Sequence, residues 1–88
     1  MFPLEPKDIR QIPKEKVIAA RIGAEADSYI GYVIKSNRQD VLKFLLRDVS
    51  EIDLLQKNNN GMTALHLAIR ANSPAMVKLL CLRNHKNT

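Results

Sequence analysis

The chain has 88 residues, a length that suits one small domain and excludes the separate cores of a two-domain enzyme. Apolar residues make up 45% of the sequence and charged residues 26%, so the chain is neither low in complexity nor too polar to bury a core. Aromatic residues contribute only 5%, which leaves Leu, Ile, Val and Ala to build that core. This composition favours closely packed helices.

Cysteine usage and hydropathy limit the class of protein further. The single cysteine, Cys81, excludes an internal disulfide and a zinc site built from several thiolates. No apolar run approaches the roughly 20 residues of a membrane span, and the N-terminus lacks the basic and apolar regions of a signal peptide. We therefore expect an intracellular protein, cytoplasmic or nuclear, with no membrane partner.

The net charge of +5 is concentrated in the last third of the chain. Residues 58–88 contain Arg70, Lys78, Arg83 and Lys86 and no acidic residue. This excess of positive charge favours a partner with an acidic surface. The four charges are scattered and no aromatic residue lies among them, which argues against nucleic acid as the partner.

The first part of the chain predicts an extended lead-in and one short helix. Three prolines lie within residues 1–13, and proline removes a backbone donor and disfavours helix in the residue before it. From Lys14 the apolar residues recur with helical spacing, and Gly23 is a plausible stop. We therefore expect a short N-terminal capping helix within residues 14–23.

Four further segments show the apolar spacing of amphipathic helices. We expect helix 25–36 to pair with helix 38–48, and helix 63–71 to pair with helix 74–83. Between the two pairs, Asn58-Asn59-Asn60-Gly61 is typical of a tight turn, because Asn and Gly tolerate left-handed backbone conformations. The pattern predicts two antiparallel helix pairs.

The two pairs are copies of one unit. A shift of 35 residues places residues 41–46 on residues 76–81, both of them apolar runs with a lysine at the third position. The same shift places Asn37 on Asn72 in the turn between the helices. One offset thus aligns both helices and their connection, which indicates an internal repeat.

Residues 61–68 read Gly-Met-Thr-Ala-Leu-His-Leu-Ala, and Val-Lys-Leu-Leu follows at residues 77–80. This segment resembles the ankyrin repeat, whose unit of about 33 residues carries the signature T-P-L-H-x-A. Ala64 replaces the usual proline. The upstream copy is degenerate: at residues 28–33 it keeps the apolar spacing but lacks the Thr, the His and the turn glycine.

The resemblance implies an all-α ankyrin-repeat solenoid of antiparallel helix pairs. Its parts are the lead-in 1–13, the capping helix 14–23, a degenerate repeat 24–57 and a clear repeat 58–88. Thr63 would cap its helix and His66 would stabilise the turn.

Stacked repeats of this family ordinarily number about three or more, so we expect the chain to be a fragment or the N-terminal segment of a longer array. The last helix would then expose apolar residues that otherwise pack on the next repeat, and self-association through it is a further expectation. The residues expected on that face are Val77, Leu79, Leu80 and Leu82.

The sequence contains no catalytic constellation, cofactor motif or metal-ligand cluster. Its histidines, His66 and His85, have no acidic residue near them in the sequence, and its glycines are isolated from one another. Cys81 aligns with Leu46 and is expected to be a buried apolar residue. We therefore predict that the chain is not an enzyme.

The resemblance implies a protein–protein interaction module that binds its partner in a concave groove, formed by the turns and by the first helix of each repeat. A second possibility is an N-terminal targeting segment of a larger multidomain enzyme or secreted effector, whose activity lies beyond residue 88. The predicted groove residues are Asn59, Asn60, Met62, Arg70 and Ala71 in the second copy, and Asp27, Lys35 and Ser36 in the first.

Overall fold

A computed structural model of the chain describes residues 3–49 and 52–86, with side chains as far as Leu82. Within these residues the secondary structure consists of helices joined by turns, with one isolated β-bridge. The helices are α1 (Pro6–Ile9), α2 (Lys14–Ala19), α3 (Tyr29–Lys35), α4 (Gln39–Asp48), α5 (Ala64–Arg70) and α6 (Pro74–Lys86).

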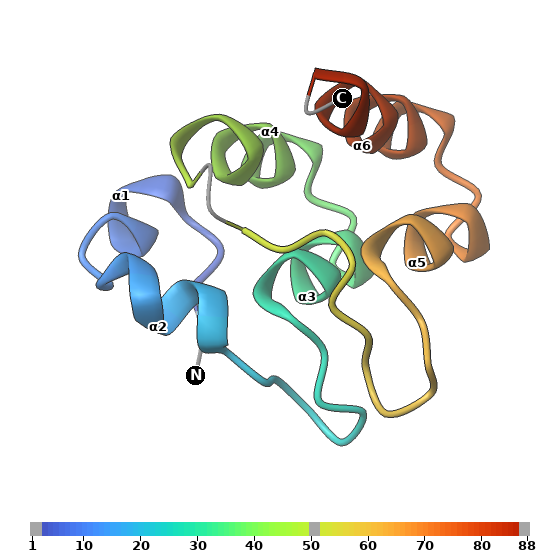
Figure 1. Cartoon of the computed structure of the whole chain (residues 1–88). Coiled ribbons are helices and arrows are strands. Elements are labelled where there is room, and N and C mark those ends of the chain that lie inside the picture. Colours follow the sequence, from blue (N-terminus) through green and yellow to red (C-terminus); the bar gives the residue numbers. More distant parts are fainter. Residues whose placement is uncertain (1–2, 50–51, 87–88) are drawn as a thin grey trace.

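The last four helices form two pairs that stack side by side (Figure 1). Helix α3 packs on α4 and α5 packs on α6, while α3 also packs on α5 and α4 on α6. One layer therefore contains the two shorter helices, α3 and α5, and the other contains the two longer ones, α4 and α6. This arrangement confirms the predicted all-α class.

Equivalent residues cap the first helix of each pair. The Ser28 hydroxyl accepts a hydrogen bond from the Gly31 N–H at 3.2 Å, and the Thr63 hydroxyl accepts one from the His66 N–H at 3.4 Å. The His66 Nδ1 in turn accepts a hydrogen bond from the Thr63 N–H at 3.3 Å, which completes a capping box. In the upstream copy, Ser28 performs the capping that the lost threonine would supply.

Left-handed backbone conformations also repeat at the 35-residue offset. Asn37 and Asn72 end the first helix of each pair with φ of 57° and 55°. In the preceding turns, Ala26 has a φ of 54° at the position where Gly61 has a φ of 75°. Although alanine stands where the second copy has glycine, the turn forms because the bridge between Ile22 and Asp27 closes it and Gly23, with a φ of 76°, supplies its other left-handed residue.

Three expectations about the N-terminal half of the chain are wrong. The capping helix expected over residues 14–23 ends at Ala19, since Ala20 has an extended backbone. The helix expected from residue 25 begins at Tyr29, because residues 22–27 form the turn just described. Within residues 1–13, expected to be extended, Pro6–Ile9 forms α1. Proline is compatible with the first turn of a helix, where no N–H donor is required.

The core lies between the two layers and uses the same positions of both repeats. The buried pairs related by the 35-residue offset are Tyr29 and Ala64, Val33 and Ala68, Val41 and Met76, and Leu45 and Leu80. Gly31 allows α5 to come close to α3, since a Cβ on this residue would lie 3.0 Å from the Leu67 Cδ1.

The N-terminal helices cover one end of the stack. Figure 1 shows α1 and α2 beside α3 and α4, on the side away from α5 and α6. Ile9 and Val17 are each only 2% exposed and contribute to the core. The Tyr29 hydroxyl donates a hydrogen bond to the Pro3 carbonyl at 2.6 Å, which ties the start of the chain to α3.

Two large apolar side chains are exposed at the other end of the stack. Ile69 and Leu82 are 58% and 53% exposed. Leu80, expected on this outer face, is instead buried because it packs between the layers. Cys81, expected to be buried, is exposed, since Leu80 occupies the inward direction on this turn of α6.

Tyr29 makes the attachment of the N-terminal segment sensitive to alkaline pH. Burial, with a smaller contribution from Tyr32, raises the pKa of the Tyr29 phenol from 10.0 to about 12. The unfolded chain therefore ionises this group first, and the stability associated with the neutral phenol is present below pH 10 and lost as the pH rises toward 12. We expect the difference in unfolding free energy between wild type and Tyr29→Phe to shrink across this range. Urea unfolding at a series of pH values measures it, and a difference that stays constant with pH would contradict the assignment.

Candidate functional site

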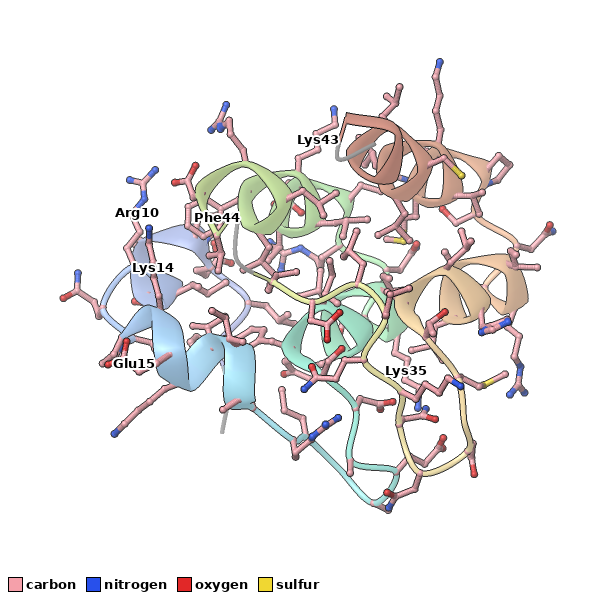
Figure 2. All side chains as sticks on the ribbon, in the orientation of Figure 1. Arg10, Lys14, Glu15, Lys35, Lys43 and Phe44 are labelled. Atoms are coloured by element: carbon pink, nitrogen blue, oxygen red, sulfur yellow. The ribbon has the colours of Figure 1, made fainter. Side chains whose placement is uncertain are left out.

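The turns and the first helices of the two repeats, in which the groove was predicted, lie on one side of the structure. The turns at residues 22–27 and 58–62 project from the same side of the stack, beyond the ends of α3 and α5 (Figure 1). Figure 2 shows Lys35, the last residue of α3, directed toward this region. We call the surface formed by the two turns together with α3 and α5 the concave face.

A buried hydrogen bond joins the two turns at the base of this face. The Asn58 amide donates to the Asp27 carboxylate at 2.9 Å, and the two residues are 8% and 6% exposed. The Asn58 side-chain oxygen accepts hydrogen bonds from the N–H groups of Asn60 and Met62 at 2.8 and 3.0 Å. Asn58 therefore shapes its own turn and holds the neighbouring turn in place.

Glu25 makes a second set of connections between the turns. Its carbonyl accepts a hydrogen bond from the Asn59 N–H at 2.8 Å, and its carboxylate accepts one from the Asn60 side-chain amide. Lys35 forms ion pairs with Glu25 at 3.3 Å and with Asp27 at 2.9 Å. The network thus places two carboxylates around one ammonium group.

The ion pairs keep Lys35 charged. The hydrogen bond to Asp27 raises the pKa of the Lys35 ammonium above its ordinary value, and the contacts with Glu25 act in the same direction. Lys35 in turn supplies the positive charge that the buried Asp27 carboxylate requires. Lys35 therefore compensates charge within the network and contributes little net positive charge to the concave face.

A recess of about 280 Å³ lies beside this network. Its lining residues are Glu25, Lys35, Leu67, Arg70 and Ala71. Arg70 is exposed and donates a hydrogen bond to the Met62 sulfur at 3.5 Å, and it forms no ion pair with any residue that the structure describes. The recess therefore combines an apolar wall with one cation that is open to a partner.

The structure brings some of the predicted groove residues together. The recess is lined by Lys35, Arg70 and Ala71. The Met62 sulfur accepts a hydrogen bond from Arg70 at its edge. Exposed Asn59 and Asn60 lie at the tip of the second turn.

Two of the predicted groove residues are placed differently. Asp27 is 6% exposed, so its carboxylate serves the network beneath the surface. Ser36 is half-buried at the end of α3 and does not line the recess.

Sequence reasoning missed Glu25 and the structural role of Asn58. The 35-residue offset that relates Asp27 to Met62 also relates Glu25 to Asn60, so it could have identified Glu25 as a residue of the turn. The bond between Asn58 and Asp27 spans 31 residues and crosses from one repeat to the next. Such a contact has no local sequence signal.

The described residues contain no group of three His, Cys, Asp or Glu side chains that could hold a metal ion. Among the helices in the described part of the chain, none is long and apolar enough to cross a membrane.

Comparison with protein families agrees with this geometry. A family model for ankyrin repeats in three copies matches residues 14–88. The chain belongs to the ankyrin-repeat family. No curated protein and no solved structure matches the chain with significance.

Ankyrin repeats are generally protein–protein interaction modules, and the family typically acts as a non-catalytic scaffold. The match begins at Lys14, so it includes α2 as well as the two stacked helix pairs. The boundaries assigned from the sequence to the two repeats stay predictions.

Proposed function

We propose that the chain binds a partner protein through its concave face and has no catalytic activity of its own. The proposal rests on the recess between the two repeats, which Arg70 lines. The neighbouring charges of Lys35, Glu25 and Asp27 are paired with one another. The turns that frame the recess are held by hydrogen bonds across the repeats. A surface fixed in this way loses little conformational entropy on binding.

The charges of the recess indicate the chemistry of the partner. Lys35 is paired with two carboxylates, whereas Arg70 contacts only a neutral sulfur atom among the described residues. An acidic side chain of the partner can form a bidentate contact with the Arg70 guanidinium while an apolar group packs on Leu67. The exposed side-chain amide of Asn59 adds hydrogen-bonding groups at the tip of the turn, whereas that of Asn60 is already bonded to Glu25.

We expect Arg70→Glu to weaken binding of the partner, because it reverses the charge of the open cation. Lys43→Glu makes the same change of charge at an exposed position of α4, outside the concave face, and is the matched control. The measurement is an affinity capture with the wild-type chain, followed by titration of the purified partner against each variant. A loss of about tenfold or more for Arg70→Glu, with Lys43→Glu near wild type, is the expected result. Equal binding of the two variants would contradict the proposal.

The apolar residues exposed on α5 and α6 support self-association as a second interaction. Exposed Ile69 forms part of a recess of about 330 Å³ together with Val77 and residues of the turn before α6. Leu82, on α6, is a further exposed apolar side chain. Clustered apolar groups at the end of a helical repeat favour contact with another apolar surface.

We expect the chain to associate with itself at rising concentration and Ile69→Glu to remain monomeric. Sedimentation velocity over a concentration series measures both. Lys57→Gln, at an exposed position before the second turn, makes the same change of one unit in net charge and is the control. A wild-type chain that stays monomeric throughout the series would exclude this interaction.

A further inference from the structure

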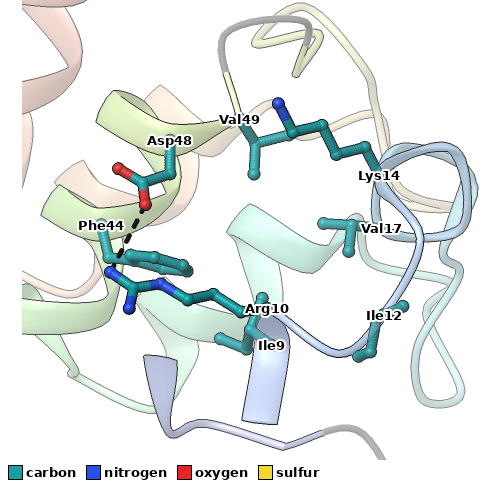
Figure 3. Close-up of a pocket in the computed structure, with 8 residues that line it drawn as sticks. All are labelled: Ile9, Arg10, Ile12, Lys14, Val17, Phe44, Asp48 and Val49. Carbon is teal, nitrogen blue, oxygen red and sulfur yellow. Dashed lines mark ion pairs between the residues drawn. The ribbon is translucent and has the colours of Figure 1, made fainter. Parts of the chain in front are cut away.

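A second recess lies at the opposite end of the stack from the exposed apolar residues, where the N-terminal segment meets α4. Its volume is about 270 Å³. Figure 3 shows its residues, which come from α1, the turn after it, α2 and the end of α4. They are Ile9, Arg10, Ile12, Lys14, Val17, Phe44, Asp48 and Val49.

The floor of this recess is apolar and belongs to the folded core. Ile9, Val17, Phe44 and Val49 are each 6% exposed or less. Sites for complete small molecules usually measure about 300–1,000 Å³, so this recess suits one or two side chains of a larger partner. An apolar side chain placed here would lose its contact with water, and the floor needs no rearrangement to receive it.

The rim carries more positive than negative charge. Arg10 and Lys14 extend along it (Figures 2 and 3), and Asp48 is the only acidic residue in the lining. Asp48 also contacts Arg47, which donates to its carboxylate at 3.3 Å. Lys14 forms no ion pair with a residue that the structure describes. The rim therefore retains positive charge that the chain itself does not neutralise.

The Phe44 ring holds the Arg10 side chain, while the Arg10 guanidinium donates no hydrogen bond to a residue that the structure describes. Its guanidinium carbon lies 5.2 Å from the centre of the Phe44 ring, a cation–π contact that restricts the side chain. The ion pair with Asp48 is 3.7 Å long, beyond hydrogen-bond distance, as the dashed line in Figure 3 marks. A carboxylate from a partner can approach the guanidinium more closely and accept two hydrogen bonds from it.

From these observations we infer that this recess binds a peptide segment in which a bulky apolar side chain lies next to acidic residues. The apolar side chain occupies the floor above Val17 and Phe44. The neighbouring carboxylates contact Arg10 and Lys14 at the rim. This surface is separate from the concave face and shares no lining residue with the recess there.

The test uses the full chain and the peptide acetyl-Glu-Leu-Leu-Glu-amide, with binding followed by NMR through the backbone amide shifts. We expect millimolar binding with shift changes centred on Ile9, Val17 and Phe44. Two control peptides separate the contributions: acetyl-Gln-Leu-Leu-Gln-amide removes the carboxylates and acetyl-Glu-Ala-Ala-Glu-amide removes the apolar anchor. Each control peptide should bind about tenfold more weakly than the parent.

Variants locate the binding on the chain. Arg10→Gln should weaken binding of the parent peptide about tenfold, because it removes the held cation. Lys7→Gln, at an exposed position of α1 outside the recess, should leave the affinity unchanged. An absence of shifts at millimolar peptide, equal binding of the neutral peptide, or an affinity that Arg10→Gln does not change would each overturn the inference. Shift changes confined to the concave face would overturn it as well.

Discussion

The hydrogen bond between Asp27 and Asn58 is the constraint on which the arrangement of the repeats depends. It is buried at the base of two turns that are 31 residues apart, so neither side chain can turn to water without separating the turns. Lys35 compensates the Asp27 charge, and Glu25 adds contacts with the second turn. The recess on the concave face has its shape because this network fixes the relative position of its two sides.

The sequence was sufficient to predict the repeated features of the fold. The cap at Thr63 and the turns at Asn37 and Asn72 are local properties, each determined by a few neighbouring residues. The cap at Ser28 is equally local but was missed, because the helix was expected to begin at residue 25. The 35-residue offset joined these local signals into two copies of a helix pair. Because each copy must bury the same positions, the offset also predicted the pairing of helices that the structure shows.

Features that depend on contact between the copies could not be predicted. The turn at Ala26 forms because the bridge from Ile22 to Asp27 closes it, although alanine seldom adopts this conformation. The burial of Asp27 and the role of Asn58 arise only when two turns meet in space. Apolar spacing also failed to separate Leu80 from Cys81, since both lie in one continuous apolar run and the run alone does not determine which of its residues faces the core.

A double-mutant cycle on Asp27→Ala and Asn58→Ala measures how strongly this hydrogen bond joins the two repeats. Unfolding free energies of the wild type, both single variants and the double variant give the coupling between the two side chains. The account predicts a coupling of about 1 kcal/mol or more, because either single change leaves a buried polar group without its partner. The pair Asn58→Ala and Asp40→Ala, in which Asp40 is an exposed residue of α4, should be additive. A coupling between Asp27 and Asn58 below about 0.5 kcal/mol would contradict the account.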